Sequence, residues 1–101
     1  MVKVFIERRI HKNDYGKMME FLKDIRAKAL HQPGYISGET LVRGDDPVDV
    51  LTVGTWISEG HWEAWLNSEP RAELDNIISA LVLEDPTIKV YKIAEHEDEI
   101  D

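Results

Sequence analysis

Hydrophobic and polar residues alternate along the first ten positions of the chain. The apolar members of this alternation share one face of an extended segment over residues 2–10, at Val2, Val4, Ile6 and Ile10. A period of two is typical of a strand that turns one face toward a core. Three further segments have strand composition, at residues 35–43, 48–57 and 88–94. The middle two are separated by Gly-Asp-Asp-Pro, a turn composition that favours a hairpin.

Two other segments follow a helical period. In residues 15–30 apolar side chains recur at steps of three and four, at Met18, Leu22, Ile25 and Ala29. Asn13 or Asp14 can cap this helix, and the Pro-Gly pair after it ends it. The second helical segment begins after Ser58 and has an aromatic stripe at Trp62 and Trp65. It should restart near Ser68, because Pro70 lacks an amide hydrogen and is tolerated in a first turn.

The order of these elements is strand, helix, strand, strand, helix, strand. This order predicts the α+β class and a ferredoxin-like βαββαβ fold, with a four-stranded antiparallel sheet and both helices on one face. We expect one such domain over residues 1–94 and an acidic C-terminal tail over residues 95–101. The strands are apolar on both faces, which calls for a second cover. A second copy of the sheet is the economical cover, so we predict a homodimer through the sheet face.

Composition excludes several classes of protein. The chain has 101 residues and no cysteine, so disulfides, thiolate nucleophiles and cysteine-based metal sites are excluded. A net charge of −8 opposes binding to nucleic acid or to anionic lipid. No apolar stretch is long enough to span a membrane, and the N-terminus has charges where a signal peptide is apolar. We therefore expect a soluble cytoplasmic protein with neither nucleic acid nor membrane as a partner.

Common catalytic motifs are absent from the sequence. It contains no glycine-rich phosphate loop, no HExxH and no nucleophile elbow. The four histidines, His11, His31, His61 and His96, lack the i, i+4 spacing of a metal site on one helix. The local motifs therefore favour no metal, although they leave a metal site assembled from distant residues open.

Three segments resemble the antibiotic biosynthesis monooxygenase family of dimeric α+β barrels: "PGYISGETLV", "VGTWISEGHWEAWLNSEPR" and "PTIKVYKI". The resemblance implies a substrate pocket between the helices and the sheet of each subunit. It also implies a monooxygenase that needs no metal, flavin or haem cofactor. In such an enzyme a small electron-rich aromatic or quinol, once deprotonated, reduces dioxygen directly. The pocket for this chemistry must be apolar and poor in water, with a few polar groups.

The resemblance also suggests site residues. It implies a catalytic role for Trp65 and His61, and substrate binding by Tyr35, Trp56, Trp65 and Asp75. Each has a structural alternative. Both helical tryptophans and Trp56 have the spacing of core residues, His61 fits an exposed first turn, and Tyr35 fits an anchor for the strand start. We interpret Trp62 as core, Trp65 as pocket lining, and Arg43 and Arg71 as solvated charges.

Two other functions compete with this one. The first is a noncatalytic dimeric module that binds a small apolar or aromatic ligand or stabilises an assembly. The second is haem degradation, found in a branch of the same family that has a haem-ligating histidine ten residues after the tryptophan and an asparagine in the first strand. Here that step from Trp65 reaches Asp75, and the first strand offers Ile6 and Glu7. A carboxylate is a poor substitute for imidazole on haem iron, so haem degradation is disfavoured.

Overall fold

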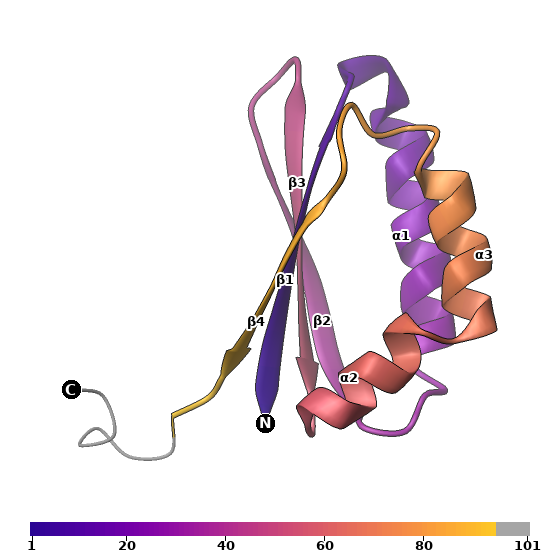
Figure 1. The fold of residues 1–101 in the computed structure, drawn as a ribbon. Helices are drawn as coiled ribbons and strands as arrows, with labels where there is room; N and C mark the ends of the chain where they lie inside the picture. The colour runs from indigo at the N-terminus through magenta and orange to yellow at the C-terminus, as the bar shows by residue number, and fades with distance from the viewer. Residues whose placement is uncertain (95–101) are drawn as a thin grey trace.

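The computed structural model of the chain describes residues 1–94, and the predicted acidic tail lies outside the described residues. Its single antiparallel sheet has the order β2-β3-β1-β4. The strands are β1 (Val2–Ile10), β2 (Tyr35–Arg43), β3 (Val48–Trp56) and β4 (Thr87–Lys92). The helices are a 3-10 turn η1 (Lys12–Asp14), then α1 (Tyr15–Ala29), α2 (Glu59–Leu66) and α3 (Glu69–Ile78). Figure 1 shows α1, α2 and α3 together on one face of the sheet, which confirms the predicted ferredoxin-like α+β arrangement.

The predicted helix restart at Ser68 is confirmed, and the hydroxyl of Ser68 joins the two helices. Ser68 Oγ donates to the carbonyl of Trp65 at 2.7 Å and accepts the amide of Arg71 at 3.4 Å. Pro70 lies in the first turn of α3, as its missing amide hydrogen requires. The start of α1 differs from the prediction: Asp14 stands at the cap position but its side chain makes no capping hydrogen bond, and η1 precedes the helix.

The alternation along β1 places its apolar side chains in the core. The four predicted apolar residues are all buried on the side of the helices, and Arg8 shares their face and is buried with them. Two clusters of buried side chains make up the core. One surrounds the three tryptophans and includes Ile6, and the other surrounds Met18 and includes Ile10. Arg8 therefore lies on β1 between the two clusters.

No helix covers the opposite face of the sheet within residues 1–94 (Figure 1). Phe5 and Tyr91 pack edge to face there with ring centroids 5.4 Å apart. Leu41, Tyr91 and Ile93 are exposed. This uncovered face has the apolar character on which the homodimer prediction depends, and the pairing of two such faces stays a prediction. None of the helices in the described part of the chain has the length and apolar character needed to cross a membrane.

Candidate functional site

A pocket of about 80 Å³ lies between the helices and the sheet. Its walls come from β1, β2, β3 and all three α-helices. We call it the helix-side pocket and define it by its aromatic and arginine lining: Arg8, Tyr35, Trp56, Trp62, Trp65 and Arg71. The resemblance implied a pocket in this place.

The aromatic walls form one continuous cluster around Trp56. The centroid of its ring lies 5.1 Å from that of Tyr35 and 6.1 Å from that of Trp62, and both pairs are edge to face. The Trp65 centroid is 6.4 Å away, and the planes of these two rings differ by 27°. Trp56 comes from the end of β3, whereas Trp62 and Trp65 lie one turn apart on α2. Packing of α2 across this end of the sheet therefore gives the pocket rigid aromatic walls.

Both helical tryptophans belong to this wall. Trp62 and Trp65 are 4% and 2% exposed, and both line the helix-side pocket. The predicted division, with Trp62 as core and Trp65 as lining, is therefore not visible in their placement. One turn of helix separates them, so both keep to the buried stripe and reach the same space.

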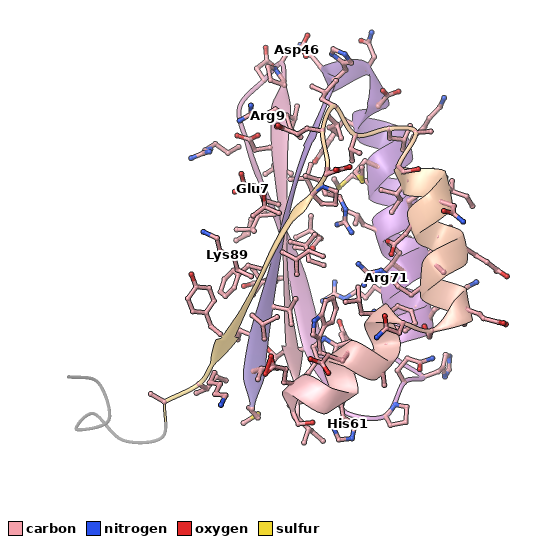
Figure 2. The ribbon with its side chains drawn as sticks, in the orientation of Figure 1. Glu7, Arg9, Asp46, His61, Arg71 and Lys89 are labelled. Carbon is pink, nitrogen blue, oxygen red and sulfur yellow. The ribbon has the colours of Figure 1, made fainter. Side chains whose placement is uncertain are left out.

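The interpretation of Arg71 as a solvated charge is wrong. Arg71 is only 3% exposed and points from α3 toward the sheet (Figure 2). Its Nε donates to both carboxylate oxygens of Asp75, at 3.0 and 3.1 Å. Its guanidinium carbon lies 5.4 Å from the ring centroid of Trp62 and 5.9 Å from that of Trp65. The ring faces and the carboxylate compensate the buried cation, which explains why it is held inside.

Arg8 is the second buried cation in the pocket lining. It is 3% exposed, and its Nε has no hydrogen-bond partner within residues 1–94. Burial, followed by the nearby charge of Arg71, lowers the pKa of Arg8 to about 10, and Asp75 opposes this shift. Arg8 therefore remains a cation at neutral pH, in a position where water is largely excluded.

His61 lies outside the lining of the helix-side pocket. Its Nδ1 is 2.7 Å from Ser58 Oγ, the atom that also accepts the His61 amide at the start of α2. The other side of its ring rests on Gly34, which has a φ of 85° and where a Cβ would collide with the imidazole. Figure 2 shows His61 at the foot of α2, apart from Arg71. The structure does not bring His61 and Trp65 to one surface of the pocket.

The remaining predicted residues have mixed positions. Tyr35 and Trp56 line the pocket beside Trp65, and Gly38 gives the Tyr35 hydroxyl room, since a Cβ there would collide with it. Asp75 is not in the lining, but its carboxylate accepts a hydrogen bond from Arg71, which is. Arg43, with its side chain 79% exposed, is solvated as expected. Within residues 1–94, no three histidine or carboxylate side chains gather as they would around a metal ion.

Sequence reasoning missed both buried arginines, although the pattern contained a signal for each. Position 8 is the only inward-facing position of β1 that has a polar residue. Position 71 is one turn before Leu74 and two turns before Ile78 on the buried stripe of α3. A charged residue in a slot that the period assigns to the core is an observation that points to a functional site.

Known proteins share both sequence features and the fold of this chain. A family model described as "Antibiotic biosynthesis monooxygenase" matches residues 1–74. A sequence search of curated proteins found no match. Solved structures with a similar fold include a putative antibiotic biosynthesis monooxygenase from Nitrosomonas europaea, with 11% identity, a TM-score of 0.83, and 93% of this chain and 90% of that chain covered. A conserved protein from Methanosarcina mazei has 16% identity and a TM-score of 0.82, with 90% of each chain covered.

A third similar structure is SnoaB from Streptomyces nogalater, described as a cofactor-independent oxygenase. It has 12% identity and a TM-score of 0.77, and the match covers 95% of this chain and 96% of that chain. At these identities the structures support the fold alone. The family model covers most of the chain and confirms the resemblance seen in the sequence. The chain belongs to the antibiotic biosynthesis monooxygenase family.

Proposed function

We propose that this protein is a cofactor-independent monooxygenase that acts on a small electron-rich aromatic or quinol. The observation that carries the proposal is the helix-side pocket, whose walls are Tyr35 and the three tryptophans. Membership in a family described as monooxygenases supports the reaction class. The aromatic lining of the pocket supports a planar ligand, which can stack on the ring faces.

The pocket would serve the reaction in two ways. Its aromatic walls exclude water and stack on a planar ring, which protects a reactive carbanion or phenolate from side reactions. Buried cations favour the deprotonated substrate, which is the form that passes electrons to dioxygen. With an anthrone-like phenol a ring methylene becomes a carbonyl, and with a hydroquinone a ring C–H becomes C–OH while the ring is oxidised to the hydroxyquinone. One oxygen atom enters the product, the other leaves as water, and all four electrons come from the substrate.

We propose binding roles for Tyr35, Trp56 and Trp65, while Asp75 acts by positioning Arg71. Trp65 is the proposed catalytic contact. His61 is the proposed proton acceptor, although it lies outside the pocket lining. The variant His61→Gln tests this role. A base is required for turnover but not for binding, so turnover should fall while ligand affinity stays the same.

The test of the function is a dioxygen-uptake screen with metal-free protein against hydroquinones and anthrone-like phenols. We expect one dioxygen to be consumed per oxygenated product, an anthraquinone-type ketone from an anthrone-like phenol or a hydroxyquinone from a hydroquinone, with water and no hydrogen peroxide as the second product. Uptake only after a metal or flavin is added would contradict cofactor independence. A haemin titration runs alongside it. Because Asp75 is paired with Arg71 and no histidine lines the described pocket, no histidine-ligated Soret band should form.

The noncatalytic alternative has one observation in its favour. The imidazole that was predicted as base bonds to Ser58 and lies outside the pocket lining, which leaves buried lining groups that are mainly apolar or cationic. A pocket of that kind binds ligands without needing to turn them over. Saturable ligand binding with no dioxygen uptake across the whole screen would favour this alternative, with the same pocket as a binding site.

A further inference from the structure

We infer that the helix-side pocket contains an anion subsite, in which Arg8 and Arg71 hold an ionised oxygen substituent of an aromatic ligand. This inference rests on the proposed function in one respect, because it names the substrate class of the same pocket. Binding does not require turnover, so the two can fail separately.

The charge balance of the pocket calls for an anion. Arg8 and Arg71 are each 3% exposed, and Asp75 is hydrogen-bonded to Arg71 and acts on Arg8 through its charge. Two buried cations and one anion leave a net positive charge inside. Among the exposed lining residues Arg26 adds a further positive charge, and the register places the side chain of Glu39 on the same face of the sheet as Phe5. The pocket therefore keeps a surplus of positive charge.

The hydrogen-bond balance points to the same place. Arg8 Nε is the only fully buried side-chain nitrogen or oxygen in the described part of the chain that lacks a partner. Burying a charged donor without an acceptor is costly, so a structure that keeps such a group calls for an explanation. The Arg8 side chain lines the pocket, so a ligand oxygen entering there can accept this hydrogen bond.

Arg71 is already oriented for this task. Asp75 holds its Nε, and the rings of Trp62 and Trp65 lie 5.4 and 5.9 Å from its guanidinium carbon. Both of these hydrogen bonds to Asp75 are made by Nε and not by the terminal nitrogens. A planar guanidinium fixed in this way matches the two oxygens of a carboxylate better than an ammonium does. The tryptophans that hold the cation also form the wall on which the ligand ring stacks, so ring and anion are recognised together.

Paired ligands of the same shape test the subsite. Benzoate and benzamide differ in charge at neutral pH but hardly in size, and all three tryptophans line the pocket, so quenching of intrinsic fluorescence reports binding of either. We expect wild-type protein to prefer benzoate by at least about tenfold, the effect of one charge-assisted hydrogen bond. A second arm uses 4-nitrophenol, whose absorption separates phenol from phenolate. A bound pKa below the free value shows that an ionised ring hydroxyl also occupies the subsite.

Arg8→Met and Arg9→Met form the matched pair of variants. Both remove an arginine from β1, but Arg9 is on the uncovered face and pairs with Asp49. Arg8→Met should abolish the preference for benzoate, and Arg9→Met should keep it. Arg8→Lys should keep only part of it, because the charge remains while the planar donor set is lost. Arg8→Met should unfold at the same or a higher urea concentration than wild type, because an uncompensated buried charge is replaced by an apolar side chain.

Three results would overturn the inference: equal affinity for benzoate and benzamide in wild type, an undiminished preference in Arg8→Met, or equal loss in Arg9→Met. A variant that fails to fold is replaced by Arg71→Met in the same titration. Dioxygen uptake with neutral hydroquinones but no anion preference leaves the proposed function standing and rejects the subsite. An anion preference without dioxygen uptake from any substrate supports the subsite and rejects the proposed function.

Discussion

Trp62 and Trp65 differ little in burial, yet their neighbours suggest unequal roles. Trp65 stacks on Trp56 across the pocket, whereas Trp62 meets the same ring edge to face and lies closer to the Arg71 cation. Both are therefore wall residues, and both also belong to the core cluster of the sheet end. Replacing either tryptophan should therefore lower both the stability of the fold and the affinity for a ligand.

At this scale we predict that truncation and conservative substitution separate the two effects. Trp62→Ala should lower the free energy of unfolding by about 3 to 5 kcal/mol, as other large-to-small core truncations do. Trp65→Phe should keep folding largely intact while weakening ligand binding, since an aromatic wall remains but contact area and the indole N–H are lost. Urea midpoints and fluorescence titrations on the same preparations measure both. An unchanged midpoint for Trp62→Ala, or unchanged affinity for Trp65→Phe, would contradict these roles.

Individual side chains were the hardest part to predict from the sequence. Trp65, Trp56 and Tyr35 could be assigned to a pocket only through the family resemblance, because their residue type and spacing agree equally well with a structural role. Arg43 and Arg71 are chemically identical, so residue type could not separate the solvated one from the buried one. The difference arises from which face of its element each occupies, and Arg71 is compensated by Asp75 one turn further along α3.

Between elements, the charge network of Asp49 joins three strands. Asp49 on β3 accepts hydrogen bonds from Arg9 Nε on β1 at 2.9 Å and from Arg43 Nη2 on β2 at 3.1 Å. The bond from Arg9, then that from Arg43, lowers the pKa of Asp49 below its ordinary value of 3.8. A carboxyl with a lowered pKa stabilises the fold above its unfolded pKa, and this contribution disappears as the pH falls through the folded pKa.

We therefore predict a pH-dependent effect of Asp49→Asn. The variant should unfold at a lower urea concentration than wild type near neutral pH. The difference should start to shrink as the pH falls below about 4, where Asp49 of the unfolded chain binds its proton, and should vanish once the pH has passed the lower pKa of folded Asp49. Asp45→Asn is the control, because Asp45 is 87% exposed and its contact with Lys12 is also at the surface. A difference that stays constant down to acidic pH would show that the network does not act through the charge of Asp49.

The elements themselves were predicted closely. The bounds of β1 and β2 agree with the prediction, and β3 and β4 differ by one or two residues at their ends. Period and turn residues were sufficient because local geometry decides them. The 3-10 turn before α1 was not predicted, since Asn13 and Asp14 are equally good caps in sequence and the structure uses neither side chain as one.

For the whole molecule, the uncovered sheet face leads to a prediction about assembly. Wild-type protein should sediment as a dimer at micromolar concentration, about twice the chain mass of 11.6 kDa. Tyr91→Lys should shift it toward monomer, because Tyr91 is 55% exposed on that face, whereas Ile77→Lys, at a similarly exposed site on α3, should not. A well-folded wild-type monomer at this concentration would reject the homodimer. Sequence alone identified the apolar face but contains no direct information on what covers it.

The strand order also has a consequence for folding kinetics. β2 and β3 are consecutive and pair through a short turn, whereas β1 pairs only with strands from distant parts of the chain. Closing those long loops costs entropy that is recovered only when the central strand docks. Because Arg8 is on that strand and Arg71 is on a helix from the other half of the chain, the two arginines meet only after the slowest contacts have formed. A ligand that needs both therefore cannot act as a template for early folding, and it recognises the finished topology alone.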